Sequence, residues 1–178
     1  MRVFIGIPIP EEIRNKIKEI EKEFKIKGIK IVEPENLHWT VKFLGELNDN
    51  ELEKTKSIMD GLNFNPVKIE VRGINVFPNL SYIRTIWIGV GEGLKKFKDE
   101  LEKVNNKFSG IGKKNSNEII PHLTIGRVKF LSDKEKLIKL MKKYEEIKIG
   151  EMITTPLVLY ESILTPKGPI YKKLKVKE

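Results

Sequence analysis

The stretch that decides the fold is NLHWTVKFLGE, residues 36–46, which carries the first of only two histidines in the chain. His38 and Thr40 alternate there with the apolar residues Trp39 and Val41. Successive side chains of a β-strand point to opposite faces of the sheet. The alternation therefore predicts a strand that turns an imidazole and a hydroxyl toward a polar cleft and anchors its other face in the core.

The second histidine repeats this pattern in IIPHLTIGRV, residues 119–128. His122 and Thr124 alternate with Leu123 and Ile125, so they too are expected on one polar face of a strand. A lone histidine on a strand is more often structural than functional. Two histidines in the same four-residue pattern favour a functional site.

The similarity extends beyond the histidines and indicates an internal duplication. FIGI at residues 4–7 corresponds to WIGV at residues 87–90, and a helical pattern, a histidine strand and a second helical pattern follow each segment. We expect a single domain made of two repeat units, at about 1–80 and 81–178. Repeats of this kind commonly pack with pseudo-twofold symmetry, so corresponding residues can meet at a shared cleft.

The spacing of apolar residues and the capping residues define the expected helices. Pro10 and Glu11 open the first helix, and an Asn or Asp caps the second. Because Lys and Glu alternate over residues 11–25, the charged face of the first helix is expected in solvent. The predicted helices lie within residues 10–24, 48–62, 85–108 and 132–144.

Further strands are expected at residues 2–9 and 67–77, and loops at 77–82 and 109–118. The second loop is either a flap over a site or a surface loop without a function. Because helices and hairpins of mixed type connect the strands, we predict an α+β fold rather than a doubly wound parallel sheet. The expected architecture is bilobal, with two pseudo-symmetric lobes of mixed or antiparallel sheets flanked by helices around a central cleft.

Composition limits the compartment and the partners. The chain of 178 residues contains no cysteine, and no apolar run is long enough to span a bilayer. The N-terminal apolar stretch is too short to be a secretory signal, so we expect a cytoplasmic protein. An excess of 34 basic over 25 acidic residues gives a net charge of +9, which favours a polyanionic partner such as RNA, DNA or anionic lipid.

Three chemistries could use two imidazoles. A catalytic zinc normally takes three protein ligands, and neither histidine strand has an Asp, Glu or Cys at ligand spacing. A serine nucleophile is disfavoured because no G-x-S-x-G occurs. General acid and base catalysis fits best, with one imidazole taking a proton from the nucleophile while the other protonates the leaving group. Such a pair suits in-line displacement at phosphorus and requires neither a metal nor a cofactor.

The paired H-x-T-x elements resemble those of the two-histidine (2H) phosphoesterase superfamily, and most closely its RNA 2',3'-cyclic phosphodiesterases, also called 2'-5' RNA ligases. The likeness extends over essentially the whole chain. It includes RVFIGIPIP, LHWTVKFLGE, VFPNLSYIRTIWIGV, PHLTIGRV and LVLYESILTPKGPIYKKL. Either H-x-T-x element alone would be weak, but the ordered set is specific.

The resemblance implies a bilobal α+β fold that hydrolyses an RNA terminal 2',3'-cyclic phosphate to a 2'-phosphate without a metal. By the family's pattern, His38 is the proton donor to the departing 3' oxygen and His122 is the proton acceptor from water. Thr40 and Thr124 would bind phosphate oxygens. The family also implies ATP-independent joining of RNA ends through a 2'-5' bond. The expected partners are RNAs with 2',3'-cyclic phosphate ends, tRNA fragments among the candidates, with no membrane and no obligate protein partner.

Two further residues belong to the expected substrate-binding set. Arg127 occupies the arginine position of the family's H-x-T-x-x-R pattern and would contact the phosphate or stack on the terminal base. Strict alternation places it opposite to Thr124, so either the strand ends or bulges after Gly126, or Arg127 reaches around the cleft edge. The alternative interpretation of Arg127 is an exposed arginine at the end of a strand, without a role in the site. Tyr171 either lines the cleft or is a packed core tyrosine.

Two other functions remain open at this point. A noncatalytic protein that binds RNA ends would use the same basic cleft, although it gives no reason for two imidazoles. A phosphodiesterase for small cyclic phosphates or 2'-5' oligonucleotides would use the same chemistry on another substrate. Comparing the cleavage of these substrates separates the alternatives.

Overall fold

The computed structural model describes residues 1–112 and 118–178, where nine strands form two antiparallel sheets. Sheet A has the order β3-β1-β8-β9 and sheet B the order β2-β6-β5-β4-β7. The strands of sheet A are β1 (Arg2–Pro8), β3 (His38–Glu46), β8 (Leu157–Thr165) and β9 (Gly168–Lys177). Those of sheet B are β2 (Ile29–Ile31), β4 (Lys68–Asn79), β5 (Tyr82–Val90), β6 (Leu123–Val128) and β7 (Lys148–Ile153).

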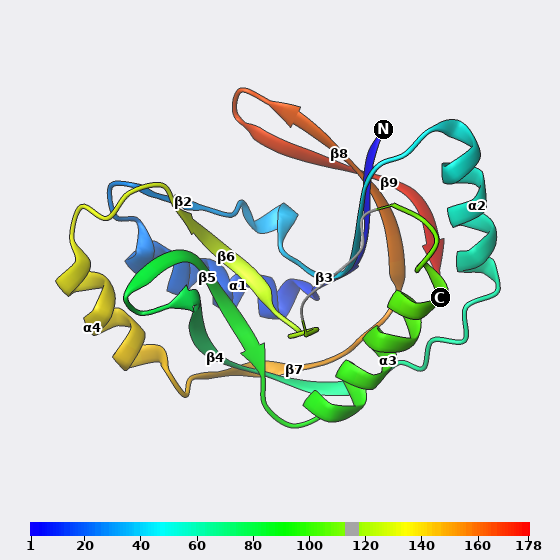
Figure 1. Ribbon diagram of the computed structural model, residues 1–178. Coiled ribbons are helices and arrows are strands. Elements are labelled where there is room, and N and C mark those ends of the chain that lie inside the picture. Colours follow the sequence, from blue (N-terminus) through cyan, green and yellow to red (C-terminus); the bar gives the residue numbers. More distant parts are fainter. Residues whose placement is uncertain (113–117) are drawn as a thin grey trace.

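Each sheet packs against two helices. α2 (Asp49–Asp60) contacts β9 and α3 (Leu94–Lys107) contacts β3 of sheet A, whereas α1 (Glu11–Glu21) and α4 (Lys134–Tyr144) contact sheet B. Figure 1 shows α2 and α3 at one end of the molecule, α4 at the other end and α1 nearer the middle, with the β8–β9 hairpin extending beyond the other strands. The predicted α+β, bilobal architecture is confirmed, with sheets that are antiparallel. In the described ranges no helix is both long enough and apolar enough to cross a membrane.

The two halves of the chain are interleaved in the sheets. β4 belongs to the first half but pairs with β5 in sheet B. β8 and β9 belong to the second half but lie in sheet A, where β8 pairs with β1 and β9 pairs with β8. The repeat units at 1–80 and 81–178 stay a prediction, and each sheet contains strands from both of them.

Helix α1 buries one more charge than its pattern predicts. Ile13 and Ile17 are buried, as the helical spacing predicts. Glu21, which the alternation of Lys and Glu placed in solvent, is buried because it follows Ile17 by one helical turn. Neither of its carboxylate oxygens has a hydrogen-bond partner among the described residues. Burial, followed by the charge of Glu33, raises the pKa of Glu21 to about 8.

Capping side chains fix where two helices begin. Asn48 accepts a hydrogen bond from the backbone N–H of Glu51, whose carboxylate accepts one from the backbone of Asn48. This capping box begins α2 at the predicted position. Asp133 caps α4 through the backbone N–H of Lys136.

Residues 77–82, predicted to form a loop, are part of a tight hairpin. β4 runs to Asn79 and β5 begins at Tyr82, which leaves only Leu80 and Ser81 as the turn. The side-chain oxygen of Asn79 accepts hydrogen bonds from the backbone N–H groups of Ser81 and Tyr82. A side-chain oxygen that mimics the backbone in this way closes the turn within two residues.

The core separates into a large cluster and a small one. The large cluster lies between the sheets and their helices, and it includes Val3 and Ile5 of β1. Phe4 alternates with these residues and faces the other side of sheet A. There it belongs to a small group, which we call the aromatic cluster: the buried Phe4, Val158 and Tyr160, with the partly buried Phe43 and Tyr171 packed against them.

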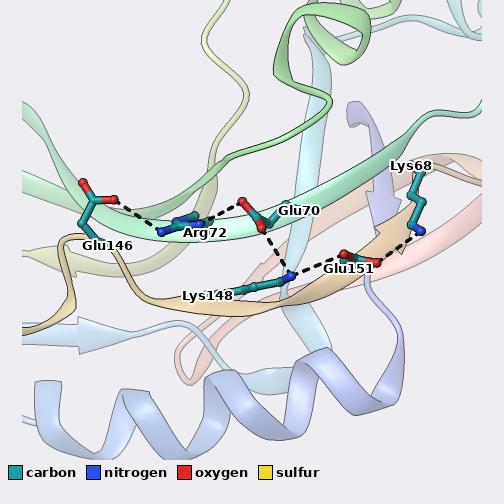
Figure 2. Close-up of polar contacts among 6 residues, drawn as sticks. All are labelled: Lys68, Glu70, Arg72, Glu146, Lys148 and Glu151. Atoms are coloured by element: carbon teal, nitrogen blue, oxygen red, sulfur yellow. Dashed lines mark hydrogen bonds and ion pairs between the residues drawn. The ribbon is translucent and has the colours of Figure 1, made fainter.

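A network of charged side chains connects β4 to β7 at the edge of sheet B (Figure 2). Glu70 of β4 lies directly opposite Glu151 of β7. Lys148 Nζ lies 3.4 Å from a carboxylate oxygen of each, so it offsets the repulsion between the two facing carboxylates. The network comprises Lys68, Glu70, Arg72, Glu146, Lys148 and Glu151.

Candidate active site

The two His-x-Thr motifs lie on strands of different sheets. In β3 His38 and Thr40 are half-buried, whereas Trp39 between them is buried in the large core cluster. In β6 Thr124 is likewise half-buried, and His122 immediately precedes the strand. Both motifs therefore turn their polar side chains away from the core, as the alternation predicts.

A β-bulge in β6 places Arg127 on the same face as Thr124. Adjacent residues of β5 lie opposite Thr124 and Gly126, so Ile125 is an extra residue in the strand. A bulge shifts the alternation of side chains by one residue. Arg127 is accordingly exposed while Gly126 is buried. Of the alternatives that the sequence left open for Arg127, a bulge is the one that occurs, and it precedes Gly126 instead of following it.

The same irregularity occurs in β3. Adjacent residues of β1 lie opposite Thr40 and Lys42, which leaves Val41 as the extra residue. The next side chain on the face of Thr40 is therefore Phe43, which is half-buried. Phe43 and Arg127 thus occupy equivalent positions in the two motifs.

Residues of both motifs line one pocket of about 140 Å³. All four predicted substrate-binding residues line the pocket together with His38, and Asn36 and residues 30–33 and 167–169 complete its wall. The predicted residues are Thr40, Thr124, Arg127 and Tyr171. His122 does not line this pocket, but it lies two residues before Thr124, which does.

Backbone carbonyl groups fix the tautomer of both imidazoles. Nδ1 of His38 lies 2.7 Å from the carbonyl oxygen of Asn36, and Nδ1 of His122 lies 2.8 Å from that of Ile120. A carbonyl oxygen only accepts hydrogen bonds, so each Nδ1 carries a proton and donates it. In the neutral ring, Nε2 is then the nitrogen that can accept a proton. In His38 this atom lies 3.0 Å from Oγ1 of Thr40.

Burial makes both histidines weak bases in the free protein. Desolvation lowers the pKa of His38 from 6.5 to about 4, although the hydrogen bond to Asn36 opposes it. Desolvation also lowers the pKa of His122. The charge of Arg127 lowers the pKa of both rings further. An anion bound between the rings and Arg127 would reverse this electrostatic effect.

Each imidazole lies beside a stacked pair of aromatic rings. The His38 ring is 4.8 Å from Phe4, which stacks on Tyr160 at 5.1 Å. The His122 ring is 5.2 Å from Phe77, which stacks on Trp87 at 4.5 Å. The rings restrict the orientation of each imidazole and desolvate it.

Tyr171 lies beside both His38 and Arg127. Its ring meets the His38 ring edge-on, with 5.3 Å between the centres. Burial raises the pKa of Tyr171, while the charges of Arg127 and Arg2 lower it. Tyr171 therefore both lines the pocket and packs in the aromatic cluster, so the two interpretations from sequence hold together.

The structure tests neither the predicted flap over the site nor the predicted reaction without a metal. The flap predicted at 109–118 includes residues 113–117, which lie outside the described residues. Across residues 1–112 and 118–178, no three His, Asp or Glu side chains are grouped so that they could hold a metal ion. A reaction without a metal or a cofactor stays a prediction.

Two antiparallel sheets that bring two His-x-Thr-x motifs to one cleft define the class of two-histidine phosphoesterases. The family model described as LigT like Phosphoesterase matches residues 7–87 and 90–171. The chain therefore belongs to the LigT-like phosphoesterase family, as the resemblance predicted.

Known relatives and one solved structure are similar over nearly their whole length. The RNA 2',3'-cyclic phosphodiesterase of Methanocaldococcus jannaschii is 46% identical over 98% of this chain and 99% of the relative. That of Archaeoglobus fulgidus is 39% identical over 100% of both chains. A crystal structure of a protein from Thermus thermophilus superposes with a TM-score of 0.82 at 25% identity, covering 99% of this chain and 97% of the other.

Sequence reasoning missed the groups that hold the imidazoles. Phe4 was interpreted as part of a buried strand, although its correspondence with Trp87 in the two repeats was the available signal. Asn36 and Ile120 act through backbone carbonyl groups, which no residue type reveals. Tyr160 comes to the site only through the pairing of β8 with β1.

Proposed function

We propose that this protein hydrolyses the terminal 2',3'-cyclic phosphate of RNA to a 2'-phosphate in the cytoplasm. His38 acts as the general acid and His122 as the general base. The main support is that residues of both His-x-Thr motifs, from different sheets, line one pocket together with Arg127. The names of the relatives supply the substrate class.

The reaction is an in-line displacement at phosphorus. A water oxygen attacks the phosphorus while Nε2 of His122 accepts its proton. The bond from phosphorus to the 3' oxygen breaks on the opposite side, and Nε2 of His38 gives that oxygen a proton. The 2' oxygen keeps the phosphate. Thr40 and Thr124 bind the non-bridging oxygens between the two rings.

The proposed acid must be protonated when the substrate is bound. Burial opposes this in the free protein, because it lowers the pKa of His38 to about 4. The phosphodiester brings a negative charge next to the ring and favours the imidazolium. Arg127 contributes the opposite charge and binds the phosphate, so substrate binding and protonation of His38 support one another.

The same displacement with a different nucleophile gives the ligation that the family resemblance implies. A 5'-hydroxyl of a second RNA takes the place of water on the His122 side and forms a 2'-5' bond. No nucleotide triphosphate is consumed, because the cyclic phosphate already carries the strained bond that breaks.

The test is incubation of a cyclic-phosphate-ended RNA with the protein in the presence of EDTA, followed by identification of the hydroxyl that keeps the phosphate. We expect a 2'-phosphate, and we expect His38→Ala and His122→Ala each to remove roughly 10² to 10⁴ of the rate. Circular dichroism checks that both variants fold.

Three outcomes of this experiment contradict the proposal in different ways. A 3'-phosphate product would exchange the leaving oxygen and the proton roles. Tight binding without turnover would identify a protein that only binds RNA ends. Faster cleavage of cyclic mononucleotides or of internal 2'-5' bonds would assign the site to those substrates.

A further inference from the structure

The aromatic cluster continues beyond the pocket on the same face of sheet A. Phe43 packs against this cluster and is half-buried, so part of its ring is accessible. It does not line the pocket around His38. An accessible aromatic ring next to a phosphate site is the feature that stacks on nucleobases in proteins that bind single-stranded RNA.

Arg2 lies over this ring. The carbon at the centre of its guanidinium is 5.3 Å from the centre of the Phe43 ring. Glu46, the residue opposite Arg2 in the sheet, pairs instead with the N-terminal amino group at 3.1 Å. Arg2 is exposed, and no ion pair involves it in the part of the chain that the structure describes. Its guanidinium is therefore available to a phosphate or a base.

Arg2 and Phe43 are continuous with the pocket. Phe43, over whose ring Arg2 lies, packs against the same aromatic cluster as Tyr171, and Tyr171 lies edge-on to His38. Phe4 connects Phe43 to the pocket. Phe43 packs against the cluster that contains Phe4, and the centres of the Phe4 and His38 rings are 4.8 Å apart. One surface of sheet A thus extends from the catalytic imidazole to Arg2.

The proposed function, on which this inference rests, indicates which way the RNA chain runs along this surface. His38 protonates the departing 3' oxygen, so the terminal ribose lies on the His38 side of the phosphorus, against sheet A. The RNA chain continues from the 5' oxygen of that ribose. Lys173, which lies opposite Tyr160 in the sheet and is exposed, adds a second positive charge beside its path.

We propose that Phe43 and Arg2 bind the nucleotide that precedes the cyclic-phosphate terminus. Phe43 stacks on its base, and Arg2 contacts the phosphate that joins it to the terminal nucleotide. The substrate class is then a single-stranded oligoribonucleotide end, and a cyclic mononucleotide occupies only part of the site.

The experiment compares kcat/KM for adenosine 2',3'-cyclic phosphate with that for the adenylyl dinucleotide that ends in the same cyclic phosphate. We expect the wild-type protein to prefer the dinucleotide by about tenfold or more, the size of one base–aromatic stacking contact. Phe43→Ala brings the ratio of the two values close to one. Phe43→Tyr keeps the ratio, and Arg2→Gln lowers it and weakens its dependence on salt.

A second variant and a matched control separate binding from structure. Phe43→Leu keeps apolar packing in the aromatic cluster but removes the aromatic face, and it lowers the ratio as Phe43→Ala does. Tyr82 and Arg84 form a similar exposed pair, with 5.4 Å between guanidinium and ring, on the hairpin of sheet B. Tyr82→Ala therefore leaves the ratio unchanged.

The outcomes also separate this inference from the proposed function. If the wild-type protein cleaves neither compound, the proposed function fails. If it cleaves both with equal kcat/KM, only the dinucleotide site is wrong. A preference that survives in Phe43→Leu and Arg2→Gln would place the preceding nucleotide elsewhere and overturn the inference.

Discussion

Nε2 of His38 lies 3.0 Å from Oγ1 of Thr40, while Nδ1 of the same ring faces the carbonyl oxygen of Asn36 at 2.7 Å. Because Nδ1 carries a proton, Thr40 donates its hydroxyl hydrogen to Nε2 when the ring is neutral, and it accepts from Nε2 when the ring is charged. The residue two positions along the strand therefore holds the reactive nitrogen in place in both protonation states.

Thr40→Val should lower kcat/KM for a cyclic-phosphate-ended RNA by roughly tenfold to a hundredfold. Hydrogen bonds to charged groups contribute about 1.5–3 kcal/mol, and the substitution keeps the shape of the side chain. Thr40→Ser, which keeps the hydroxyl, should retain most of the activity. Equal rates in the Val and Ser variants would show that the hydroxyl has no part in the reaction.

The pH dependence of kcat/KM follows from the two lowered pKa values. Burial lowers the pKa of His38 to about 4 and that of His122 below its usual 6.5. In the active form only one of the two Nε2 atoms, that of His38, carries a proton. At low pH the Nε2 of His122 is protonated as well, and at high pH the Nε2 of His38 loses its proton, so both extremes reduce the active fraction. We expect a bell-shaped profile with its maximum below pH 6.5 and a decline of about tenfold per pH unit above it. A profile that rises up to pH 8 would contradict the description of these rings.

Glu21 should make the fold less stable as the pH rises. The pKa of this carboxyl is raised to about 8 in the folded state, against its ordinary value of 4.5. Between these values the unfolded chain ionises while the folded chain keeps its proton, so the free energy of unfolding falls with rising pH. Glu21→Gln should be more stable than the wild type at pH 8 by on the order of 2 kcal/mol, with the difference vanishing near pH 4.5. Urea unfolding at both pH values measures this, and Glu12→Gln, at an exposed carboxylate of the same helix, serves as the control.

Lys148 should matter more for stability than an ordinary surface lysine. It lies between the facing carboxylates of Glu70 and Glu151, and their repulsion remains when its charge is removed. Lys148→Met should therefore lower the urea midpoint, and high salt should reduce the loss. Lys139→Met, which breaks only an exposed pair with Glu135, should leave the midpoint unchanged. Equal midpoints for the two variants would show that the network of Figure 2 contributes nothing.

Local patterns predicted the elements that local chemistry controls. The alternation around His38 and Thr40 indicated the strand and the face of each side chain, and Asn48 indicated the start of α2. Short-range periodicity and capping decide these features, so they are visible in a single sequence.

Features that depend on distant pairing could not be predicted in this way. β8 lies beside β1 although more than a hundred residues separate them, and this pairing brings Tyr160 and Tyr171 to His38. The bulge at Ile125 depends on the register with β5, so strict alternation assigned Arg127 to the wrong face. Glu21 is buried because of what packs on α1 and not because of its own residue type.

Separate proton roles for the two imidazoles at one phosphorus are the central claim, and leaving-group replacement tests them most directly. The measurement is the rate of P–O cleavage in a nucleoside 2'-phosphodiester of 4-nitrophenol, whose phenolate leaves without protonation. We predict that His38→Ala recovers most of the wild-type rate on this compound, while His122→Ala stays as slow as on the cyclic phosphate. Recovery in His122→Ala instead, or no loss in either variant on the cyclic phosphate, would contradict the account.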